Sequence, residues 1–309
     1  MPRTTSGPSR RSLLLAAALV PLAGCGTGTE SPARRATPAP APSRLRPAPS
    51  VDVSEYAALE RRHGARLGVY ALDTGSGAAA AYRDGERFAF CSTFKALAAA
   101  AVLHREALPA LERRVPISAD DVNTISPVTE TRTGGSMTVR QLCDAAVRFS
   151  DGTAGNLLLR ELGGPDGLTA YFRTLGDTVS RMDRYEPGLH RGRVEDPRDT
   201  TTPRAVSEDF RRLLLGDALP ADKRALLDGW MRASTTGESR IRAALPKGWR
   251  AANKTGTGKY GRANDVAVLW PPSGAPLLLA VMSDRPGADD RPQEALVAEA
   301  ARLALADVR

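Results

Sequence analysis

Three short strings along the chain place hydroxyl and amine side chains at spacings suited to a nucleophile and its base. In order, they are Ser92-Thr93-Phe94-Lys95, Ser150-Asp151-Gly152 and Lys254-Thr255-Gly256. The chain has 38 Arg and only 5 Lys, so its composition favours Arg wherever a positive charge alone is needed. A lysine can lose its proton when it is partly buried beside another cation, whereas a guanidinium in practice cannot. Lys95 could therefore accept the proton of Ser92, which predicts acyl transfer through an activated serine.

Ser92 and Lys95 are expected to lie on the first turn of a helix. Residues three apart face the same side of a helix, and the positive helix N-terminus adds stabilisation where an oxyanion forms. The next residues, 96–101, are small and apolar (A-L-A-A-A-A), which is typical of a fully buried helix. Taken alone, this string has an alternative interpretation, a capped core helix with an extended lysine.

Other common hydrolytic sites do not fit the sequence. No Gly-Xaa-Ser-Xaa-Gly elbow occurs, and the three histidines, His63, His104 and His190, are scattered singly. A Ser-His-Asp triad and a metal-dependent hydrolase are therefore disfavoured, and we expect neither a metal nor a cofactor. The spacing of Cys91 and Cys143 argues neither for nor against a disulfide.

The first 50 residues differ in composition from the rest. Residues 1–24 have a basic start and an apolar run at 13–22, which indicates an export signal. This run is shorter than the roughly 20 residues that span a bilayer, which disfavours a single-pass anchor. Residues 25–50 are rich in Pro, Ala and Arg, which predicts a flexible tether.

Two details refine the export signal. Ser9-Arg10-Arg11-Ser12-Leu13-Leu14 resembles a twin-arginine export sequence, and Leu22-Ala23-Gly24-Cys25 resembles a lipobox at which Cys25 would be lipidated. An ordinary signal cleaved without lipidation is the alternative. We expect an exported protein, either attached through Cys25 to the outer face of the bacterial membrane or secreted.

The chain has a net charge of +8 and a pI near 9.8, and most of this positive charge lies in residues 1–50. Residues 1–50 carry seven Arg against Glu30, which leaves 36 basic and 34 acidic residues in 51–309. The folded part therefore lacks the electrostatic footprint of a nucleic-acid-binding protein.

Strand patterns occur at both ends of the folded part, and helical patterns lie between them. Strands are predicted at residues 66–73, 78–83, 250–257, 263–270 and 276–283. Helices are predicted at residues 52–63, 96–108, 139–149, 153–162, 166–175, 203–215 and 291–306. This order predicts an α/β (α+β) fold, in which one sheet domain is built from residues 51–90 and 232–309 and an all-α domain, 91–231, is inserted in it.

The ordered strings resemble the penicilloyl-serine transferase superfamily, and specifically the class A serine β-lactamases. Residues 184–190 (R-Y-E-P-G-L-H) and 196–203 (D-P-R-D-T-T-T-P) are similar to the family's Ω-loop, here 181–199. Residues 126–130 (S-P-V-T-E) and 235–246 also match family segments, so the resemblance covers about 52–308. It implies a β-lactamase/transpeptidase-like fold, with an antiparallel sheet flanked by helices and the active site between sheet and helical domain.

The resemblance also implies roles for individual residues. Ser92 would attack the lactam carbonyl, with Lys95, Glu186 or both taking its proton, a choice that the sequence leaves open. Ser150 would pass a proton to the lactam nitrogen, and Glu186 would activate water for deacylation. The backbone N–H groups of Ser92 and Thr257 would form the oxyanion hole. The substrate would be bound by Lys254, Thr255, Gly256, Thr257 and Arg240.

The Ω-loop has its own expected supports. By resemblance, Arg184 and Asp199 would close the loop through a salt bridge, and the side chain of Asn156 would hold it down. The Glu186-Pro187 bond is expected to be cis, as in the family.

The sequence departs from the family pattern at several positions of the site. Gly152 stands where the family has Asn, which removes an amide that would contact the substrate and Lys95. His190 replaces the Asn that helps hold the hydrolytic water, and for this histidine a space-filling role and a water contact are both open. Ile125 replaces an aromatic residue at the cleft rim.

The two cysteines of the folded part are expected to be free thiols. In relatives with bridges, partners stand at positions that are Ala99 and Gly258 here, so Cys143 and Cys91 each lack one.

The resemblance implies hydrolysis of penicillins and cephalosporins, and hence antibiotic resistance, by a monomer that binds no nucleic acid. Two alternatives are a DD-peptidase (a penicillin-binding protein), and a lipoprotein that senses β-lactams without hydrolysing them. Glu186 in its loop argues against the first, and the intact set of Ser92, Lys95, Ser150 and Glu186 argues against the second.

Overall fold

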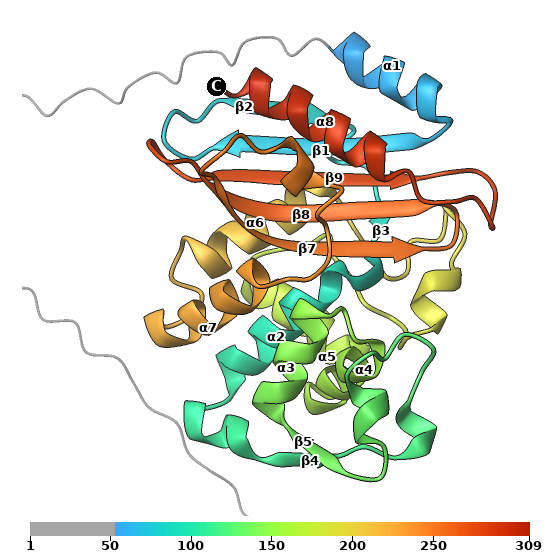
Figure 1. The fold of residues 1–309 in the computed structure, drawn as a ribbon, viewed down its shortest axis with the longest axis vertical. Coiled ribbons are helices and arrows are strands. Elements are labelled where there is room, and N and C mark those ends of the chain that lie inside the picture. Colours follow the sequence, from blue (N-terminus) through green and yellow to red (C-terminus); the bar gives the residue numbers. More distant parts are fainter. Residues whose placement is uncertain (1–52) are drawn as a thin grey trace, which may run out of the picture. The chain divides into compact units, whose positions relative to one another are not determined.

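The computed structural model describes residues 53–309, which group as one compact unit. A five-stranded antiparallel sheet in the order β2-β1-β9-β8-β7 forms its centre (Figure 1). Its strands are β1 (Arg66–Asp73), β2 (Ala79–Tyr82), β7 (Arg250–Gly258), β8 (Arg262–Trp270) and β9 (Leu277–Asp284). The predicted export signal and tether lie outside the described residues.

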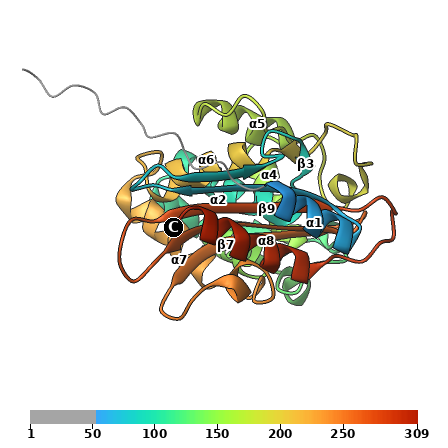
Figure 2. The same cartoon turned by 90° about the horizontal axis from the view of Figure 1, so that it is seen from above.

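The sheet is covered on both faces, which explains why its central strands are almost entirely apolar. Successive side chains of a strand point to opposite faces. In β9, Leu278, Ala280 and Met282 therefore face the core that the sheet shares with the helices of segment 91–231. The alternate residues face a second core, on the other side of the sheet, under α1 (Val53–His63) and α8 (Glu294–Asp307). Figure 2 shows α1 and α8 on one side of the sheet and α2, α4 and α6 on the other.

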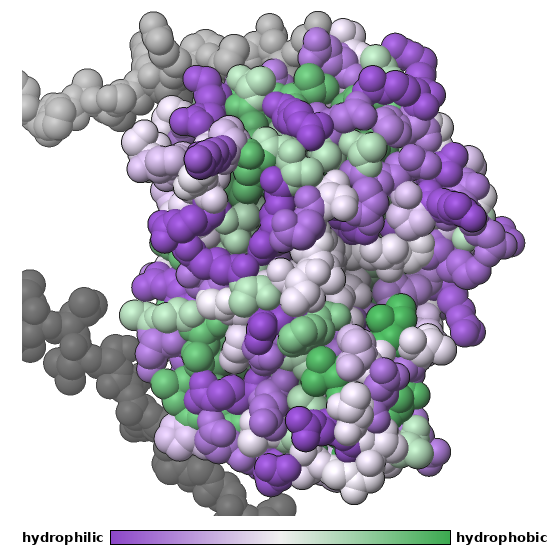
Figure 3. Space-filling model, in the orientation of Figure 1, coloured by the Kyte–Doolittle hydropathy of each residue, from purple (hydrophilic) through white to green (hydrophobic). Residues whose placement is uncertain are grey.

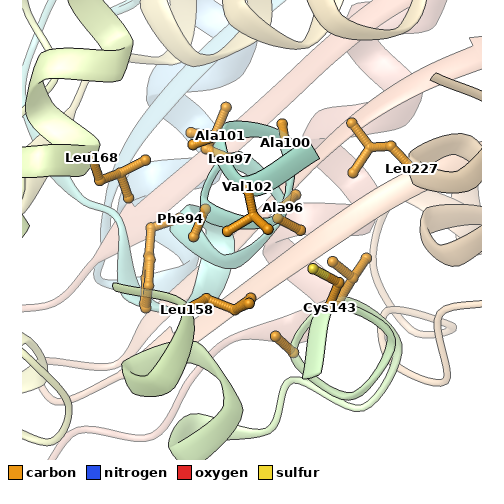
Figure 4. Close-up of a cluster of buried hydrophobic side chains, with 14 of the residues drawn as sticks. Phe94, Ala96, Leu97, Ala100, Ala101, Val102, Cys143, Leu158, Leu168 and Leu227 are labelled. Carbon is orange, nitrogen blue, oxygen red and sulfur yellow. The ribbon is translucent and has the colours of Figure 1, made fainter. Parts of the chain in front are cut away.

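Four helices pack around α2 (Phe94–Arg105), which is buried along almost its whole length. They are α3 (Val139–Arg148), α4 (Gly152–Glu161), α5 (Pro165–Thr174) and α7 (Ala221–Arg232), whereas α6 (Pro203–Leu214) packs on the sheet. Leu158, Leu168, Leu227 and Cys143 surround the alanine-rich helix in Figure 4. Small side chains on α2 let its neighbours approach closely, as the sequence predicts for residues 96–101.

Side-chain caps explain several helix starts. Thr138 and Gln141 form a reciprocal capping box at α3. Asp151 caps α4, and Thr202 caps α6 immediately before a proline in the first helical turn.

Segment 91–231 is not all-helical, in contrast to the prediction. It contains β4 (Arg114–Pro116), which pairs with β5 (Ser136–Thr138), and β6 (Thr200–Thr201), which pairs with β3 (Phe88–Ala89). Strands of two or three residues are too short to show a period of two, so the sequence pattern cannot reveal them. The segment also includes α6, which packs on the sheet against β1, β8 and β9.

Among residues 53–309, the exposed large hydrophobic residues are Val53, Ile125 and Tyr185. On the face in Figure 3 the hydrophobic residues form small, scattered groups among polar ones. No helix within residues 53–309 is both long and apolar enough to cross a membrane.

Two buried carboxyl groups meet between the start of the Ω-loop and α6. Asp209 is 1% exposed and lies beside Asp177, which accepts backbone N–H groups of Val179 and Ser180. Burial, with the neighbouring Asp177 adding to it, raises the pKa of Asp209 well above its usual range. The folded protein therefore favours the protonated Asp209 carboxyl.

This arrangement predicts a pH-dependent effect of Asp209→Asn on stability. The protonated Asp209 carboxyl stabilises the folded protein fully below the ordinary pKa of 3.8, which applies to the unfolded chain. This stabilisation is lost as pH rises through the raised pKa of the folded state. Asn does not ionise, so the variant should gain stability relative to wild type between about pH 4 and about pH 8, measured by urea unfolding. Asp217→Asn, at an exposed position, is the control. If the difference in the free energy of unfolding between Asp209→Asn and wild type is the same at about pH 4 and at about pH 8, the prediction is contradicted.

Candidate active site

Ser92 lies in a tight turn that leads directly into α2. The turn is the 3-10 helix Cys91–Thr93 (η1), and Cys91 adopts the left-handed conformation with φ of 47°. Lys95 follows on the first turn of α2, where its side chain is fully buried and its Nζ lies 3.0 Å from Ser92 Oγ. The predicted proximity of hydroxyl and amine is present.

Ser150 and Lys254 join the nucleophile from the other two strings. Lys95 Nζ donates to the carbonyl oxygen of Ser150 at 2.6 Å, and Lys254 Nζ donates to Ser150 Oγ at 3.0 Å. Burial, strengthened by the nearby Lys95 cation, lowers the pKa of Lys254 well below its usual range. The three strings, distant in sequence, thus converge on one site.

Asp151 holds the loop that carries Ser150. Its carboxylate is fully buried and accepts the backbone N–H groups of Val128, Thr129 and Ala154, together with the Thr129 hydroxyl. Ser150 adopts a left-handed φ of 56°, a conformation that costs free energy unless neighbouring contacts maintain it. Asp151 supplies those contacts, a positioning role that the sequence interpretation did not assign.

Glu186 reaches the same serine from the Ω-loop. Its Oε1 lies 3.0 Å from Lys95 Nζ and accepts a hydrogen bond from Ser92 Oγ at 3.4 Å. Burial by itself would raise the pKa of Glu186, but the charge of Lys95 and the contact with His190 outweigh it and lower the pKa to about 2. The carboxylate is therefore ionised and near both candidate proton carriers.

The backbone of Glu186 is clamped by one side chain. Asn156 Nδ2 donates to Glu186 O, and Asn156 Oδ1 accepts from Glu186 N, both at 2.8 Å. The Glu186-Pro187 bond is cis, which confirms that expectation. These contacts place the carboxylate over Ser92.

The Ω-loop ends are joined at Asp199, which is fully buried. Its carboxylate pairs with Arg184 Nε and accepts the backbone N–H groups of Asp183 and Arg184. The expected Arg184–Asp199 salt bridge is therefore present. Asp199 thus satisfies two backbone N–H groups at the start of this loop.

A cavity of about 330 Å³ opens beside these residues. Ser92, Ser150, Thr255, Thr257 and Arg240 line it, so the structure brings most of the predicted substrate-binding residues to one surface. Arg240 is 4% exposed and donates to Gly256 O and Asn264 O through Nη1, and to Thr257 Oγ1 through Nη2. Glu294 also pairs with it, at 2.9 Å.

Gly256 lets β7 lie directly against the turn that carries Ser92. A Cβ atom at this position would be 2.7 Å from Phe90 O and 3.0 Å from Cys91 Cβ. Any larger residue would therefore push the strand away from the nucleophile. Gly256, predicted as a substrate-binding residue, therefore contributes to the site through its backbone.

Comparison with known proteins shows the family of the chain. The family model described as "Beta-lactamase enzyme family" matches residues 53–308. The chain belongs to the beta-lactamase family, as a class A serine enzyme. It is 54% identical over 302 residues to the "Beta-lactamase" of Mycobacterium tuberculosis, with 96% of each chain covered. The "Beta-lactamase FAR-1" of Nocardia farcinica is 47% identical over 302 residues, covering 97% of this chain and 96% of that protein.

A solved structure supports the fold assignment. The crystal structure of the beta-lactamase from Desulfarculus baarsii has a TM-score of 0.79 and 49% sequence identity. The matched region covers 81% of this chain and 94% of the Desulfarculus baarsii chain. The predicted β-lactamase-like fold is thereby confirmed.

Two departures from the β-lactamase pattern, Gly152 and Ile125, lie beside Glu186 and the cavity, respectively. At Gly152 a Cβ would lie 2.3 Å from Glu186 Oε2 and 2.6 Å from Asn123 Oδ1, so these two side chains occupy the space of a larger residue. Ile125, 53% exposed, lies on the rim of the cavity. The sequence interpretation missed Asn123, because only the folded chain places residues 123 and 152 together.

Both cysteines of the described region are buried free thiols, which confirms the prediction. A Cβ at Gly258 would be 2.9 Å from Cys91 Sγ, so even a small side chain would crowd that sulfur. Burial raises the pKa of the Cys143 thiol above its ordinary range. Within residues 53–309, no group of three or more His, Cys, Asp and Glu side chains is arranged to hold a metal.

The Asn156 clamp predicts a selective defect in Asn156→Ala. The change leaves both peptide groups of Glu186 without partners, which should cost about 1–3 kcal/mol of stability and displace the Glu186 carboxylate. We expect release of the acyl-enzyme to slow more than its formation, measured by stopped-flow kinetics and intact-protein mass spectrometry.

Asn156→Asp is the matched control for this prediction. It keeps the acceptor for Glu186 N but places a carboxylate oxygen against Glu186 O, so an intermediate defect is expected. Equal losses of acylation and deacylation in Asn156→Ala would show that the clamp does not act through Glu186.

Proposed function

We propose that the protein hydrolyses the β-lactam amide of penicillins and cephalosporins through a Ser92 acyl-enzyme, which Glu186-activated water then releases. Such a reaction would give resistance to these antibiotics. The observation that carries the proposal is the position of Glu186 Oε1, within 3.4 Å of Ser92 Oγ and 3.0 Å of Lys95 Nζ. A carboxylate at this point can act on the serine and on a water that attacks the acyl group.

In acylation, Ser92 Oγ attacks the lactam carbonyl after losing its proton. The contacts support two routes: with Lys95 charged, the Ser92 hydroxyl donates to Glu186, and with Lys95 neutral, the amine can accept the proton directly. The backbone N–H groups of Ser92 and Thr257 are the proposed oxyanion hole. Thr257 follows Gly256 on β7, the strand that packs against the Ser92 turn.

Ser150 is proposed to return a proton to the lactam nitrogen as the C–N bond breaks. Its hydroxyl lies 3.0 Å from Lys254 Nζ, and its carbonyl oxygen fixes Lys95. The nearby Lys95 supplies positive charge that favours proton release from the hydroxyl.

The substrate carboxylate is proposed to bind at the β7 edge of the cavity. Lys254 supplies a hydrogen-bonding amine there, Thr255 supplies a hydroxyl, and the Arg240 guanidinium supplies positive charge behind Thr257. Thr255 Oγ1 lies 2.7 Å from Thr236 Oγ1, within hydrogen-bond distance, so this contact helps to fix the Thr255 hydroxyl.

The two alternatives make different predictions about the acyl-enzyme. A DD-peptidase or a non-hydrolytic sensor would form the Ser92 adduct and keep it. The Asn156 clamp holds Glu186 in contact with Ser92, an arrangement of use in deacylation and of none in a permanent adduct.

The proposal predicts opposite behaviour of wild type and Glu186→Ala toward a chromogenic cephalosporin. Wild type should turn over steadily, whereas the variant should lose about 2.7–4 kcal/mol or more of transition-state stabilisation, a loss of at least about 100-fold in kcat. Intact-protein mass spectrometry should find the adduct on Glu186→Ala only.

Glu195→Ala is the control, because Glu195 is an exposed acid of the same loop. It should hydrolyse the cephalosporin as wild type does. A lasting adduct on wild type would instead favour the peptidase or the sensor.

We also propose that the protein acts as an exported monomer, held to the outer face of the membrane by a lipid on Cys25 or shed from it. The site is built from one chain, and the leader has the basic start, apolar run and lipobox-like sequence described above. Replacement by Cys25→Ala should move the enzyme from the membrane fraction to the soluble exported fraction, measured by fractionation and hydrolysis assay. An unchanged distribution would favour an ordinary cleaved signal.

A further inference from the structure

His190 contacts the same carboxylate oxygen as the catalytic lysine. It lies four residues after Glu186 in the 3-10 helix Gly188–Arg191 (η5), and its Nε2 is 3.1 Å from Glu186 Oε1. Lys95 Nζ is 3.0 Å from that oxygen. The imidazole is 12% exposed, and within residues 53–309 neither ring nitrogen makes a well-oriented hydrogen bond. A buried ring of this kind interacts mainly through charge with Glu186.

The other side of the ring meets the thiol next to the nucleophile. Cys91 is fully buried, and its proximity to His190 is one of the causes that raise the pKa of the imidazole. Both groups lie in front of Gly258, where a Cβ would be 2.9 Å from Cys91 Sγ and 3.3 Å from His190 Nδ1. The ring therefore bridges the thiol at position 91 and the carboxylate at position 186, and Gly258 leaves room for it.

The charged groups around the ring act in opposite directions. Arg262, on β8, donates from Nη1 to His190 O at 3.4 Å and from Nη2 to Gly192 O at 2.6 Å, and Lys95 lies beyond Glu186. These cations oppose a charge on the ring, as burial does. The contacts with Cys91 and Glu186 outweigh the burial and raise the pKa of His190 to about 9.

We propose that His190 is a positioning residue whose proton controls the base strength of Glu186. In the imidazolium form, Nε2–H pairs with Glu186 Oε1, so the carboxylate has two cationic partners and is a weaker base for water. Loss of the Nδ1 proton to solvent leaves Nε2–H paired with Glu186 Oε1, so the neutral ring still holds the carboxylate in place.

The consequence is a pH-dependent deacylation step. As His190 loses its charge, Glu186 retains only the Lys95 cation, becomes more basic, and takes a proton from water more readily. Deacylation should therefore accelerate as pH rises through the His190 titration. This inference rests on the proposed role of Glu186, so its test includes a measurement independent of hydrolysis.

The first measurement is an NMR titration of the imidazole nitrogens in the full chain. The chain has only three histidines, so the His190 signals can be assigned by comparison with His190→Asn. We expect His190 to titrate above the ordinary histidine value of 6.5, and Glu186→Gln to reduce its proton affinity by about tenfold, one pKa unit. A titration at or below 6.5, or one that Glu186→Gln leaves unchanged, would overturn the pairing.

The second measurement is the decay of the acyl-enzyme in single-turnover experiments from about pH 6 to about pH 10. Wild type should show a rising limb that is absent in His190→Asn, and Cys91→Ala should shift its midpoint. His63→Asn is the matched control, because His63 lies 3.5 Å from Glu299, outside the active site. The same rising limb in His190→Asn would overturn the proposal.

The two measurements separate this inference from the proposed function. If Glu186→Gln deacylates as fast as wild type, the role of Glu186 in deacylation is wrong, whatever the titration shows. If Glu186 is required but His190→Asn keeps the pH profile of wild type, only the inference about His190 fails.

Discussion

The buried ion pair between Lys95 and Glu186 is the interaction on which the rest of the site depends. Their side chains are 0% and 2% exposed and lie 3.0 Å apart. Removing either charge from water costs several kcal/mol, so the pair is tolerated only when both groups are fixed and hydrogen-bonded. α2 must therefore place Lys95, and the Ω-loop must place Glu186, at the same time.

The supports of the pair come from distant parts of the chain. Asn156 clamps the peptide groups of Glu186, Asp199 joins the loop ends, and Asp151 holds the loop of Ser150. Each uses a side-chain carbonyl or carboxylate to satisfy backbone N–H groups that a strained or buried loop leaves without partners. Cys91, Ser150 and Asp199 adopt positive φ values, so backbone strain is concentrated at the site that these contacts hold.

The departures from the β-lactamase pattern concentrate around one carboxylate. Gly152 leaves space that Glu186 and Asn123 fill, and His190 adds a second titratable partner at Oε1. Each changes the surroundings of Glu186 without removing the Ser92–Lys95 pair. Variation in this chain therefore affects the surroundings of the carboxylate that we propose to activate water, while Lys95 Nζ keeps its 3.0 Å contact with Ser92 Oγ.

The chemistry and most elements could be predicted from the sequence, because they depend on local spacing. Ser92 and Lys95 share a helical turn, the apolar runs of the strands reflect two-sided burial, and the ordered motifs identify the family. Helix ends moved by a few residues: α2 stops at Arg105 rather than 108, and α8 starts at Glu294 rather than 291. The short strands β4, β5 and β6 were not visible, because pairing over two or three residues leaves no periodic pattern.

By itself, the sequence determined which groups could react and where most helices and strands would lie, although α7 and the strands β3 to β6 were not among the predicted elements. Tertiary structure alone decided the approach of Asn123 to Gly152, the bridge from Cys91 through His190 to Glu186, and the seating of β7 against the Ser92 turn. The physical reason is that base strength and hydrogen bonding depend on distances of a few ångströms between side chains. Those distances are set when residues far apart in the chain pack together, and a linear pattern does not encode them residue by residue.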